Sequence, residues 1–410
     1  MRPPTVLRPR DADPPLATRM QSLRRSDVRD LLRHAALPGM ISLAGGLPAA
    51  ECFDVTGLRE AAQAALCASP EAALQYGETE GDAGLRAAIA AALRAEGAAI
   101  ADAAPLITAG SQQGIDLVAR ALIDPGDTVV VERPSYLAAL QAFGLAQAQW
   151  ASIAVDEEGA RIEDLDLACA GVRPRLLYLV PDFANPTGAT LSLARRHAVL
   201  DWAVRHQVVV FEDDPYGALR FEGTPLPTLH ALAQTVPGAA QWVVRASTLS
   251  KTVAPGLRVG WLLAPPWLRE ALVRIKQATD LQTGSLTQAV AREYLRSGRQ
   301  AAPLDRVCVT YRARRDALME ALAQTFGDRL VWNAPAGGLF VWARFVDGTD
   351  TRALLAAAIE RGVTFVPGDA FYVDQADRSL LRLNFSACAP ERLREGVSRL
   401  AAAHAAVQAA

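Results

Sequence analysis

The feature that most constrains the fold is an alternation of short apolar runs with longer segments of helical periodicity, which begins near residue 54. The runs with the composition of strands are Leu106–Thr108, Thr128–Val131, Arg175–Val180, Val208–Phe211 and Trp242–Arg245. Helical periodicity is found over 54–68, 81–96, 111–122, 135–144 and 190–205. Because short apolar strands separated by helices are typically buried on both faces, the sequence predicts an α/β domain with a mainly parallel sheet.

The pattern changes near residue 300, where a smaller α+β domain is expected to begin. Its predicted elements are a charged helix at 303–326, a strand at Gly338–Ala343, a helix at 351–360, a strand at Leu380–Asn384 and a helix from about residue 390. We therefore expect an N-terminal arm and helix over 1–40, a large domain over 41–300 and a small domain over 301–410. The helix near 19–36 is expected to pack with the small domain.

Composition excludes several classes of protein. A formal net charge of −2 provides no field to hold nucleic acid or an anionic membrane, and a hydrophobic fraction of 51% excludes disorder. No uninterrupted apolar run reaches about 18 residues, so no membrane-spanning helix is expected, and the N-terminus lacks the apolar core of a secretory signal. The five cysteines and five histidines are scattered without metal-ligand spacing, so we expect no metal site and a cytoplasmic location.

Lysine is rare in this chain: of 42 basic residues only Lys251 and Lys276 are lysines. Arginine stays protonated, whereas lysine can lose its proton and act as a nucleophile. Lys251 follows a predicted strand and a small polar loop, and burial near Arg258 would lower its pKa. Taken alone, a surface lysine in a loop is the favoured interpretation of Lys251. Lys276 lies in the amphipathic stretch LREALVRIKQATD and is expected to be solvated or at an interface.

Polar clusters follow several predicted strands at their carboxyl ends, where open α/β sheets bind ligands. Ser111 is expected to cap a helix whose free N–H groups favour an anion, although it fits an ordinary cap as well. Glu212–Asp214 places three carboxylates at a strand end. Because neighbouring carboxylates repel one another, we expect either a cationic partner for one of them or a turn in which all three are solvated. Asn185–Gly188 alone indicates a turn. Arg382 lies in an apolar strand and needs an anion, from a ligand or an internal salt bridge.

In this order, the motifs resemble those of the fold-type I aminotransferases, which use pyridoxal 5′-phosphate (PLP). The resemblance covers nearly the whole chain and points to the branch with 2-aminoadipate and kynurenine aminotransferases and the catalytic half of MocR-type regulators. The matching stretches are 41–48, Gln75-Tyr76, 108–113, 134–136, 185–188, 212–216, 250–260, 337–342, Pro367-Gly368 and 381–386. The resemblance implies the PLP-dependent transferase fold of type I, α/β, with a mainly parallel seven-stranded sheet in the large domain and a smaller α+β domain.

The resemblance also implies roles in binding the cofactor ring. Lys251 would form the Schiff base with PLP and move the proton between the substrate Cα and the cofactor. Asp213, chosen over Asp214 because the family spaces this residue three before the tyrosine, would pair with the pyridine nitrogen. Asn185 and Tyr216 would bind the phenolic oxygen of the ring, and Tyr136 would stack on its face.

Other residues are implied in phosphate and substrate binding. The phosphate would be bound by Ser111, Gln112, Thr248 or Ser250, Arg258, and Tyr76 of the other subunit of a homodimer. Arg382 would hold the substrate α-carboxylate with two parallel hydrogen bonds, near Asn185, and Gly45 and Gly46 would leave room beside the substrate.

The implied function is amino transfer from an α-amino acid to 2-oxoglutarate or pyruvate by a ping-pong mechanism. A PLP-dependent lyase or cyclase of the same fold is an alternative, because such enzymes share Lys251 and Asp213. A MocR-like regulator is less favoured, because only 40 residues precede Ile41 and a winged helix hardly fits there.

Two departures from the family pattern concern substrate choice. Asp182 and Ala184 stand where the family more often carries Ser, Thr or Gln, and Leu23–Ser26 alters the N-terminal helix. Arg19, Arg24 and Arg25 are candidates to bind a distal carboxylate of the substrate, and a solvated basic face is as good an interpretation.

Overall fold

The computed structural model of the chain describes residues 16–20, 31, 33–34, 37–98, 100–101, 104–374 and 376–409. Arg19 lies in the short helix η1 (Thr18–Met20). Most of the helix expected near 19–36, including Leu23–Ser26 with Arg24 and Arg25, lies outside the described residues. No helix in the described ranges is both long and apolar enough to cross a membrane.

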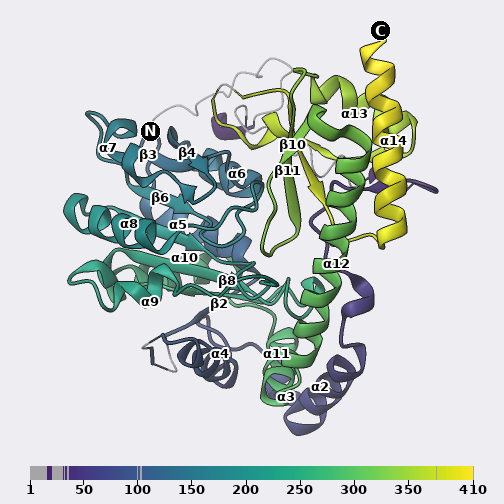
Figure 1. Cartoon of the computed structure of the whole chain (residues 1–410). Helices are drawn as coiled ribbons and strands as arrows, with labels where there is room; N and C mark the ends of the chain where they lie inside the picture. Colours follow the sequence, from purple (N-terminus) through teal and green to yellow (C-terminus); the bar gives the residue numbers. More distant parts are fainter. Residues whose placement is uncertain are drawn as a thin grey trace, which may run out of the picture.

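A large, mainly parallel sheet forms the centre of the molecule (Figure 1). Within the described residues its order is β2 (Leu106–Thr108), β9 (Gly260–Leu263), β8 (Val243–Thr248), β7 (Val209–Asp213), β6 (Leu176–Leu179), β3 (Thr128–Arg133), β4 (Gln149–Asp156) and β5 (Gly159–Ala160). The strands from β8 to β4 pair in parallel, whereas β9 is antiparallel to both of its neighbours. The predicted seven-stranded, mainly parallel sheet is confirmed, and the two-residue β5 adds a short antiparallel return.

Helices cover both faces of this sheet, as the apolar character of its strands predicts. On β3, Val129 and Val131 pack in the cluster that includes α5 (Ser111–Leu122), α6 (Leu137–Leu145) and α10 (Pro266–Asp280). Val130 points to the other face and packs with α8 (Leu193–His206) and α9 (Leu229–Ala233). This alternation follows from the two-residue period of a strand. The short α7 (Leu165–Ala168) lies along the chain between β5 and β6.

A third apolar cluster lies at the β2 edge of the sheet, at the bottom of Figure 1. Its helices are α2 (Val55–Ala68), α3 (Pro70–Leu74), α4 (Ala83–Ala95) and α11 (Ser285–Arg296). Aspartate caps begin two of them: Asp54 accepts from the Gly57 N–H at 2.9 Å, and Asp82 accepts from the Leu85 N–H at 2.7 Å. Such caps satisfy helix N–H groups that have no partner within the helix.

The C-terminal elements form a second sheet covered by long helices. The antiparallel order is β10 (Leu330–Trp332), β11 (Phe340–Phe345), β14 (Leu380–Asn384), β13 (Val366–Pro367), and the helices are α12 (Ala301–Phe326), α13 (Thr351–Glu360) and α14 (Pro390–Gln408). The predicted helix at 351–360 and strand at 380–384 match α13 and β14 residue for residue. Near the N-terminus, β1 (Ile41–Ser42) pairs in parallel with β12 (Val363–Thr364).

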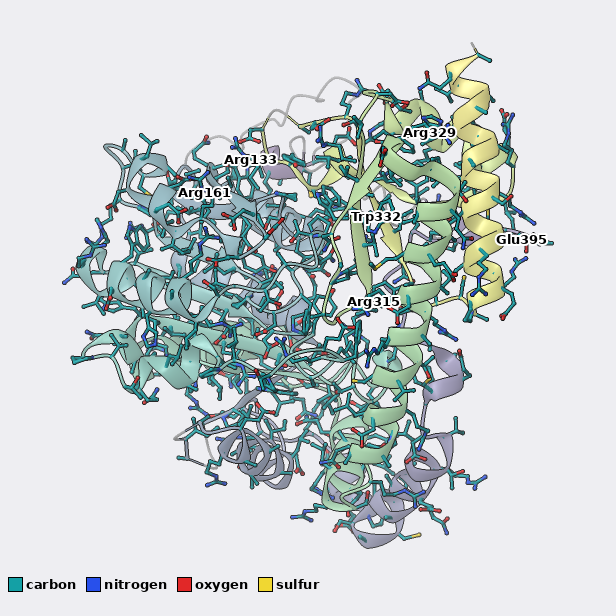
Figure 2. All side chains as sticks on the ribbon, in the orientation of Figure 1. Arg133, Arg161, Arg315, Arg329, Trp332 and Glu395 are labelled. Carbon is teal, nitrogen blue, oxygen red and sulfur yellow. The ribbon has the colours of Figure 1, made fainter. Side chains whose placement is uncertain are left out.

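The long helix α12 follows α11 near the β2 edge of the large sheet and leads to β10 of the second sheet (Figure 1). Arg315 on this helix, labelled in Figure 2, donates to Glu222 at 2.6 Å and to the Pro335 carbonyl at 2.7 Å. The division into an arm over 1–40, a large domain over 41–300 and a small domain over 301–410 stays a proposal. The remaining short helices are η2 (Ala50–Cys52), η3 (Ile162–Asp164), η4 (Ala239–Gln241), η5 (Pro255–Leu257), η6 (Gly327–Arg329) and η7 (Gly368–Phe371).

The expectation that Lys276 is solvated or at an interface is wrong. Leu268, Leu272 and Lys276 recur every four residues along α10, and all three are buried. This spacing places them on one face of the helix, so the stripe that buries the leucines also carries the lysine inward. There the Lys276 ammonium pairs with Asp280 at 2.8 Å.

Candidate active site

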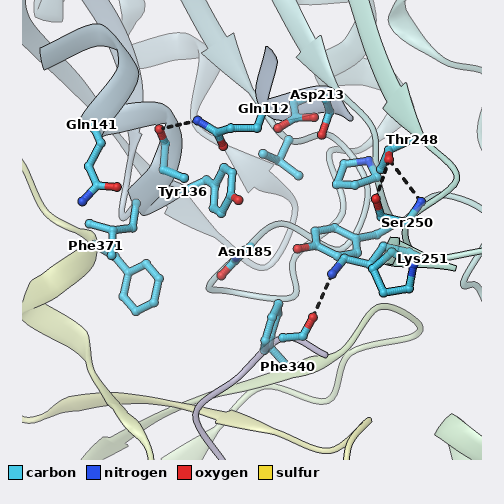
Figure 3. A pocket seen from close by; sticks show the side chains of 18 of the residues that line it. Gln112, Tyr136, Gln141, Asn185, Asp213, Thr248, Ser250, Lys251, Phe340 and Phe371 are labelled. Carbon is cyan, nitrogen blue, oxygen red and sulfur yellow. Dashed lines mark hydrogen bonds between the residues drawn. The ribbon is translucent and has the colours of Figure 1, made fainter. Parts of the chain in front are cut away.

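A cavity of about 290 Å³ lies at the carboxyl ends of β6, β7 and β8 (Figure 3). Most residues predicted for the site line it, although they come from distant parts of the chain: Gly46, Ser111, Gln112, Tyr136, Asn185, Asp213, Tyr216, Thr248, Ser250, Lys251, Arg258 and Arg382. Open α/β sheets bind ligands at this edge.

Lys251 extends into the cavity from the loop after β8, where its Nζ donates to the Gly46 carbonyl at 2.8 Å (Figure 3). Removal of the ammonium from water lowers the pKa of Lys251 to about 8, and the positive charges of Arg382 and Arg258 contribute to this lowering. Both effects favour the neutral amine that a nucleophile requires. The interpretation of Lys251 as an ordinary surface lysine is therefore wrong.

The three carboxylates that end β7 are buried and have separate partners. Glu212 accepts from the Leu229 and His230 N–H groups, and Asp214 pairs with Arg245 at 2.7 Å. Of the three, Asp213 alone lines the cavity. The interpretation of this segment as a solvated turn is therefore wrong.

Asp213 has one satisfied and one free carboxylate oxygen. Its Oδ2 accepts from the Tyr178 hydroxyl at 2.6 Å, whereas its buried Oδ1 has no hydrogen-bond partner among the described residues. Burial raises the pKa of Asp213 to about 7, although the bond from Tyr178 opposes this rise. A buried, unpartnered carboxylate oxygen is costly, so the site is suited to a ligand with a cationic N–H.

The start of α5 forms a corner of the cavity suited to an anion. The helix is capped by Gly110, with φ of 80° and no side-chain cap bond, so the expectation that Ser111 is the N-cap is wrong. Ser111 is instead the first helical residue, where N–H groups point out of the helix. Arg258 donates to the Ser250 hydroxyl at 3.3 Å and to the Ala109 carbonyl at 3.0 Å, which places its guanidinium beside this corner.

Arg382 approaches the cavity from β14 and is buried. Its two terminal nitrogens donate to Asn185 Oδ1 at 2.7 Å and to the Ala44 carbonyl at 2.6 Å. The guanidinium lies 4.0 Å from the ring centroid of Phe340 and 5.0 Å from that of Phe371. No carboxylate among the described residues forms an ion pair with it, so the internal salt-bridge alternative is wrong. Burial lowers the pKa of Arg382 to about 10.

Two predicted site residues do not line the cavity. Gly45 is buried next to Gly46 in the chain. Tyr76 lies between α3 and α4, and its side chain is 77% exposed. On the surface of this chain, Tyr76 lines a shallow depression together with Leu74 and Leu286.

Sequence reasoning missed Tyr178 and did not assign roles to Phe340 and Phe371. Tyr178 sits inside the apolar run of β6 and pairs in register with Phe211, two residues before Asp213. The sequence feature that could have identified Tyr178 is its polar hydroxyl group within an otherwise apolar predicted strand. Phe340 lay within a motif that was matched as a whole.

The family departure at Asp182 has a structural explanation. Its two oxygens pair with Arg196 at 2.9 Å and Arg220 at 2.8 Å, in a largely buried triad. The triad holds the segment that leads to Asn185, in which Phe183 takes a left-handed φ of 52°. Ala184 is buried in the same segment.

The residues present fit PLP. The free Asp213 Oδ1 suits the protonated ring nitrogen, the amine of Lys251 suits the aldehyde, and the corner at Ser111 suits the phosphate. Two glycines keep this corner open: a Cβ on Gly110 would lie 2.5 Å from Arg258 Nη2, and one on Gly260 would lie 2.8 Å from the Ser111 nitrogen. Within the described ranges, no cluster of His, Cys, Asp and Glu side chains is arranged to hold a metal ion.

Comparisons with known proteins agree with this chemistry. Residues 40–400 match the family model described as aminotransferase class I and II. The chain is 37% identical over 385 residues to aromatic-amino-acid aminotransferase 1 of Thermococcus litoralis, covering 92% of this chain and 91% of the relative. It is 38% identical over 380 residues to 2-aminoadipate transaminase of Thermus thermophilus, covering 92% and 93% of the two chains.

A solved structure has the same architecture. The α-aminoadipate aminotransferase of Thermus thermophilus, complexed with N-(5′-phosphopyridoxyl)-L-leucine, superposes with a TM-score of 0.89 at 36% identity, covering 96% of this chain and 98% of that one. These likenesses favour amino transfer over the lyase, cyclase and regulator alternatives. The chain therefore belongs to the class I and II aminotransferases of PLP fold type I, and it is a transaminase that moves an amino group from an amino acid to a 2-oxo acid.

Proposed function

We propose that Lys251 is the residue that carries PLP and moves protons during transfer. The observation that carries this proposal is that a largely buried amine of lowered pKa shares one cavity with the unpaired Asp213 Oδ1 and with Arg382, which has no carboxylate partner among the described residues. When bound, PLP supplies an aldehyde that takes the amino group and a ring that withdraws electrons from the substrate Cα.

The side chains around the ring would each perform one task. Asp213 would accept a hydrogen bond from the ring nitrogen and keep that nitrogen protonated, while Tyr178 donates to the other carboxylate oxygen of Asp213. Tyr136 would pack on the ring face, and Asn185 and Tyr216 would donate to the phenolic oxygen. Burial raises the pKa of Tyr136 to about 12 and that of Tyr216 in the same direction, so both hydroxyls stay protonated donors.

The phosphate would bind at the start of α5. Ser111 and Gln112 supply backbone N–H groups, Thr248 and Ser250 supply hydroxyls, and Arg258 supplies the positive charge. Thr248 and Ser250 already contact each other through their hydroxyl oxygens at 2.8 Å.

Arg382 would bind the α-carboxylate of the substrate. Binding an anion stabilises a buried guanidinium, and the two oxygens of a carboxylate match two parallel N–H groups of its planar guanidinium group. Gly46 lines the cavity beside this group, and a Cβ on it would lie 2.8 Å from the Phe340 ring, so a glycine there leaves the most room. Phe340 and Phe371 supply apolar walls, which support an aromatic donor. The names of two relatives support an aromatic amino acid or 2-aminoadipate as donor, and we propose 2-oxoglutarate or pyruvate as acceptor.

We further propose a homodimer with shared active sites. Leu74, Tyr76 and Leu286 are exposed on one depression, which is suited to a partner subunit, and Tyr76 would reach the partner's phosphate. All five cysteines carry free thiols, which supports a cytoplasmic location. Sedimentation at increasing ionic strength would test the dimer, and Tyr76→Ala should weaken PLP binding in it.

A single-turnover screen tests the proposed donors. The PLP form is mixed with one amino acid at a time without an acceptor, and conversion to the pyridoxamine form is followed by absorbance. We expect aromatic amino acids and 2-aminoadipate to convert the cofactor stoichiometrically, and 2-oxoglutarate or pyruvate to restore it. Conversion only by short-chain donors would contradict the substrate proposal, and product formation without conversion would indicate a lyase.

Arg382→Lys is expected to lower kcat/KM for the preferred amino acid by about 10²-fold, because a lysine cannot replace two parallel charge-assisted hydrogen bonds. The measurement compares this amino acid with the corresponding amine that lacks the carboxylate. For the amine, kcat/KM of Arg382→Lys should differ from that of the unchanged protein by less than about threefold. An equal loss with both compounds would mean that Arg382 maintains the cavity rather than binding the carboxylate.

Uptake of PLP by the cofactor-free protein is expected to depend on the protonation of Lys251. Because its pKa is lowered to about 8, the uptake rate should rise about tenfold per pH unit below pH 8 and level off above it. A free alkylamine, measured in parallel, should keep gaining reactivity towards about pH 10. A protein rate that follows the free amine would contradict the lowered pKa.

A further inference from the structure

Lys276 is a buried lysine that does not line the cavity and that forms an ion pair with Asp280. Its Nζ donates to both oxygens of Asp280, one turn further along α10, at 2.8 and 3.0 Å. The lysine side chain has no solvent exposure, whereas that of Asp280 is 27% exposed. An ammonium in such a place is costly unless it is paired, so the pair is held together tightly.

From this pair, hydrogen bonds lead to the start of α5. Asp280 Oδ2 also accepts from Gln113 Nε2 at 2.6 Å, and Gln113 Oε1 accepts from the Ala109 N–H at 2.7 Å. The Ala109 carbonyl in turn accepts from Arg258 at 3.0 Å. We call Lys276, Asp280 and Gln113 the brace. It ends on the residue that precedes the Gly110-Ser111 corner.

The corner that the brace reaches has little freedom to move. A Cβ on Gly110 would lie 2.5 Å from Arg258, and one on Gly260 would lie 2.7 Å from the Gly110 carbonyl carbon. Gly110 has a φ of 80°, which only glycine adopts readily. A small rotation at Ala109 would therefore change the direction of the helix N–H groups and the position of Arg258 together.

We propose that the brace positions the phosphate-binding corner, so that Lys276 acts on PLP affinity through Asp280 and Gln113 without touching the cofactor. The inference rests on the proposed binding of the phosphate at this corner. A purely structural role would not need charges, because a buried ion pair can be replaced by apolar residues with little loss of stability. What apolar residues cannot supply is the acceptor that orients Gln113.

The test compares affinities for PLP and for pyridoxal, which lacks the phosphate. Lys276→Met leaves Asp280 without its ion pair, although Gln113 still donates to it, and is expected to lower Tm. The double variant Lys276→Met/Asp280→Leu should restore Tm while PLP binding stays weaker by about 5- to 10-fold, with pyridoxal affinity unchanged. Gln113→Ala should lower the PLP-to-pyridoxal preference by a similar factor.

Two controls separate the possible outcomes. Glu270 and Arg274 form an exposed pair at 2.7 Å on the same helix, and Glu270→Gln/Arg274→Met should leave both affinities and Tm unchanged. Arg258→Ala must lower the PLP preference, and if it does not, the proposed phosphate site itself fails. If Arg258→Ala lowers the preference and the double variant does not, or if the double variant loses both affinities together, the brace proposal is overturned.

Discussion

Replacement of Lys251 by alanine is expected to lower kcat by about 10⁴-fold, the upper end of what a proton-transfer group contributes. The variant lacks the amine that we propose takes up PLP and moves the proton at the substrate Cα. The cavity itself should persist, because the Lys251 amine is held by a hydrogen bond to the Gly46 carbonyl rather than by an ion pair within the described part of the chain. The measurement is kcat at saturating PLP and amino acid, with Tm recorded alongside.

A small added amine provides the matched control for this variant. Methylamine should restore part of the activity of Lys251→Ala, because it can take the place of the missing amino group in proton transfer. Lys251→Arg should not respond, because the guanidinium keeps its proton and fills the space. An alanine variant with more than about a tenth of normal turnover would contradict the assigned role.

Asp213→Asn is expected to lower kcat by about 10³-fold, the scale of losing one preorganised electrostatic contact in a buried site. In the proposed role the carboxylate would hold positive charge on the ring nitrogen, whereas an amide of the same shape carries no charge. Tyr178→Phe should cost about tenfold, because it removes the 2.6 Å hydrogen bond on Oδ2 and leaves the charge in place.

A cofactor methylated at the ring nitrogen tests the reason for this loss. That analogue carries the positive charge permanently, so the Asp213→Asn protein should regain most of its kcat when loaded with it. If the analogue does not help, Asp213 acts by packing or by binding the cofactor, and the electrostatic account is wrong.

The sequence predicted the central architecture well because the core strands are uniformly apolar. β6 and β7 are buried along their whole lengths, so composition alone located them. Composition did not locate β4 and β9. β4 lies near the sheet edge with partly exposed residues. β9 is as short and as buried as β6, but it runs antiparallel to both neighbours and no α-helix separates it from β8, so it falls outside the alternation of strand and helix. Such strands are recognised by their pairing partners, which a single sequence does not display.

The sequence predicted site residues that lie in recognisable motifs. It did not predict residues whose place in the site depends on tertiary contacts. Resemblance selected Asp213 over Asp214 as the partner of the pyridine nitrogen, and of the two only Asp213 lines the cavity. It did not find Tyr178, because its contact with Asp213 depends on the register between two strands. Lys276 was misjudged because its residue type suggested solvent, although its spacing from Leu268 and Leu272 indicated burial.

The rarity of lysine makes the central claim open to one direct measurement. The holoenzyme is treated with borohydride, which fixes a lysine-bound cofactor as a stable pyridoxyl-lysine, and is then digested and mapped by mass spectrometry. Only two positions, Lys251 and Lys276, can carry the label. The account predicts near-stoichiometric labelling of Lys251 and none of Lys276. Label on Lys276, or on neither lysine in an active preparation, would contradict it.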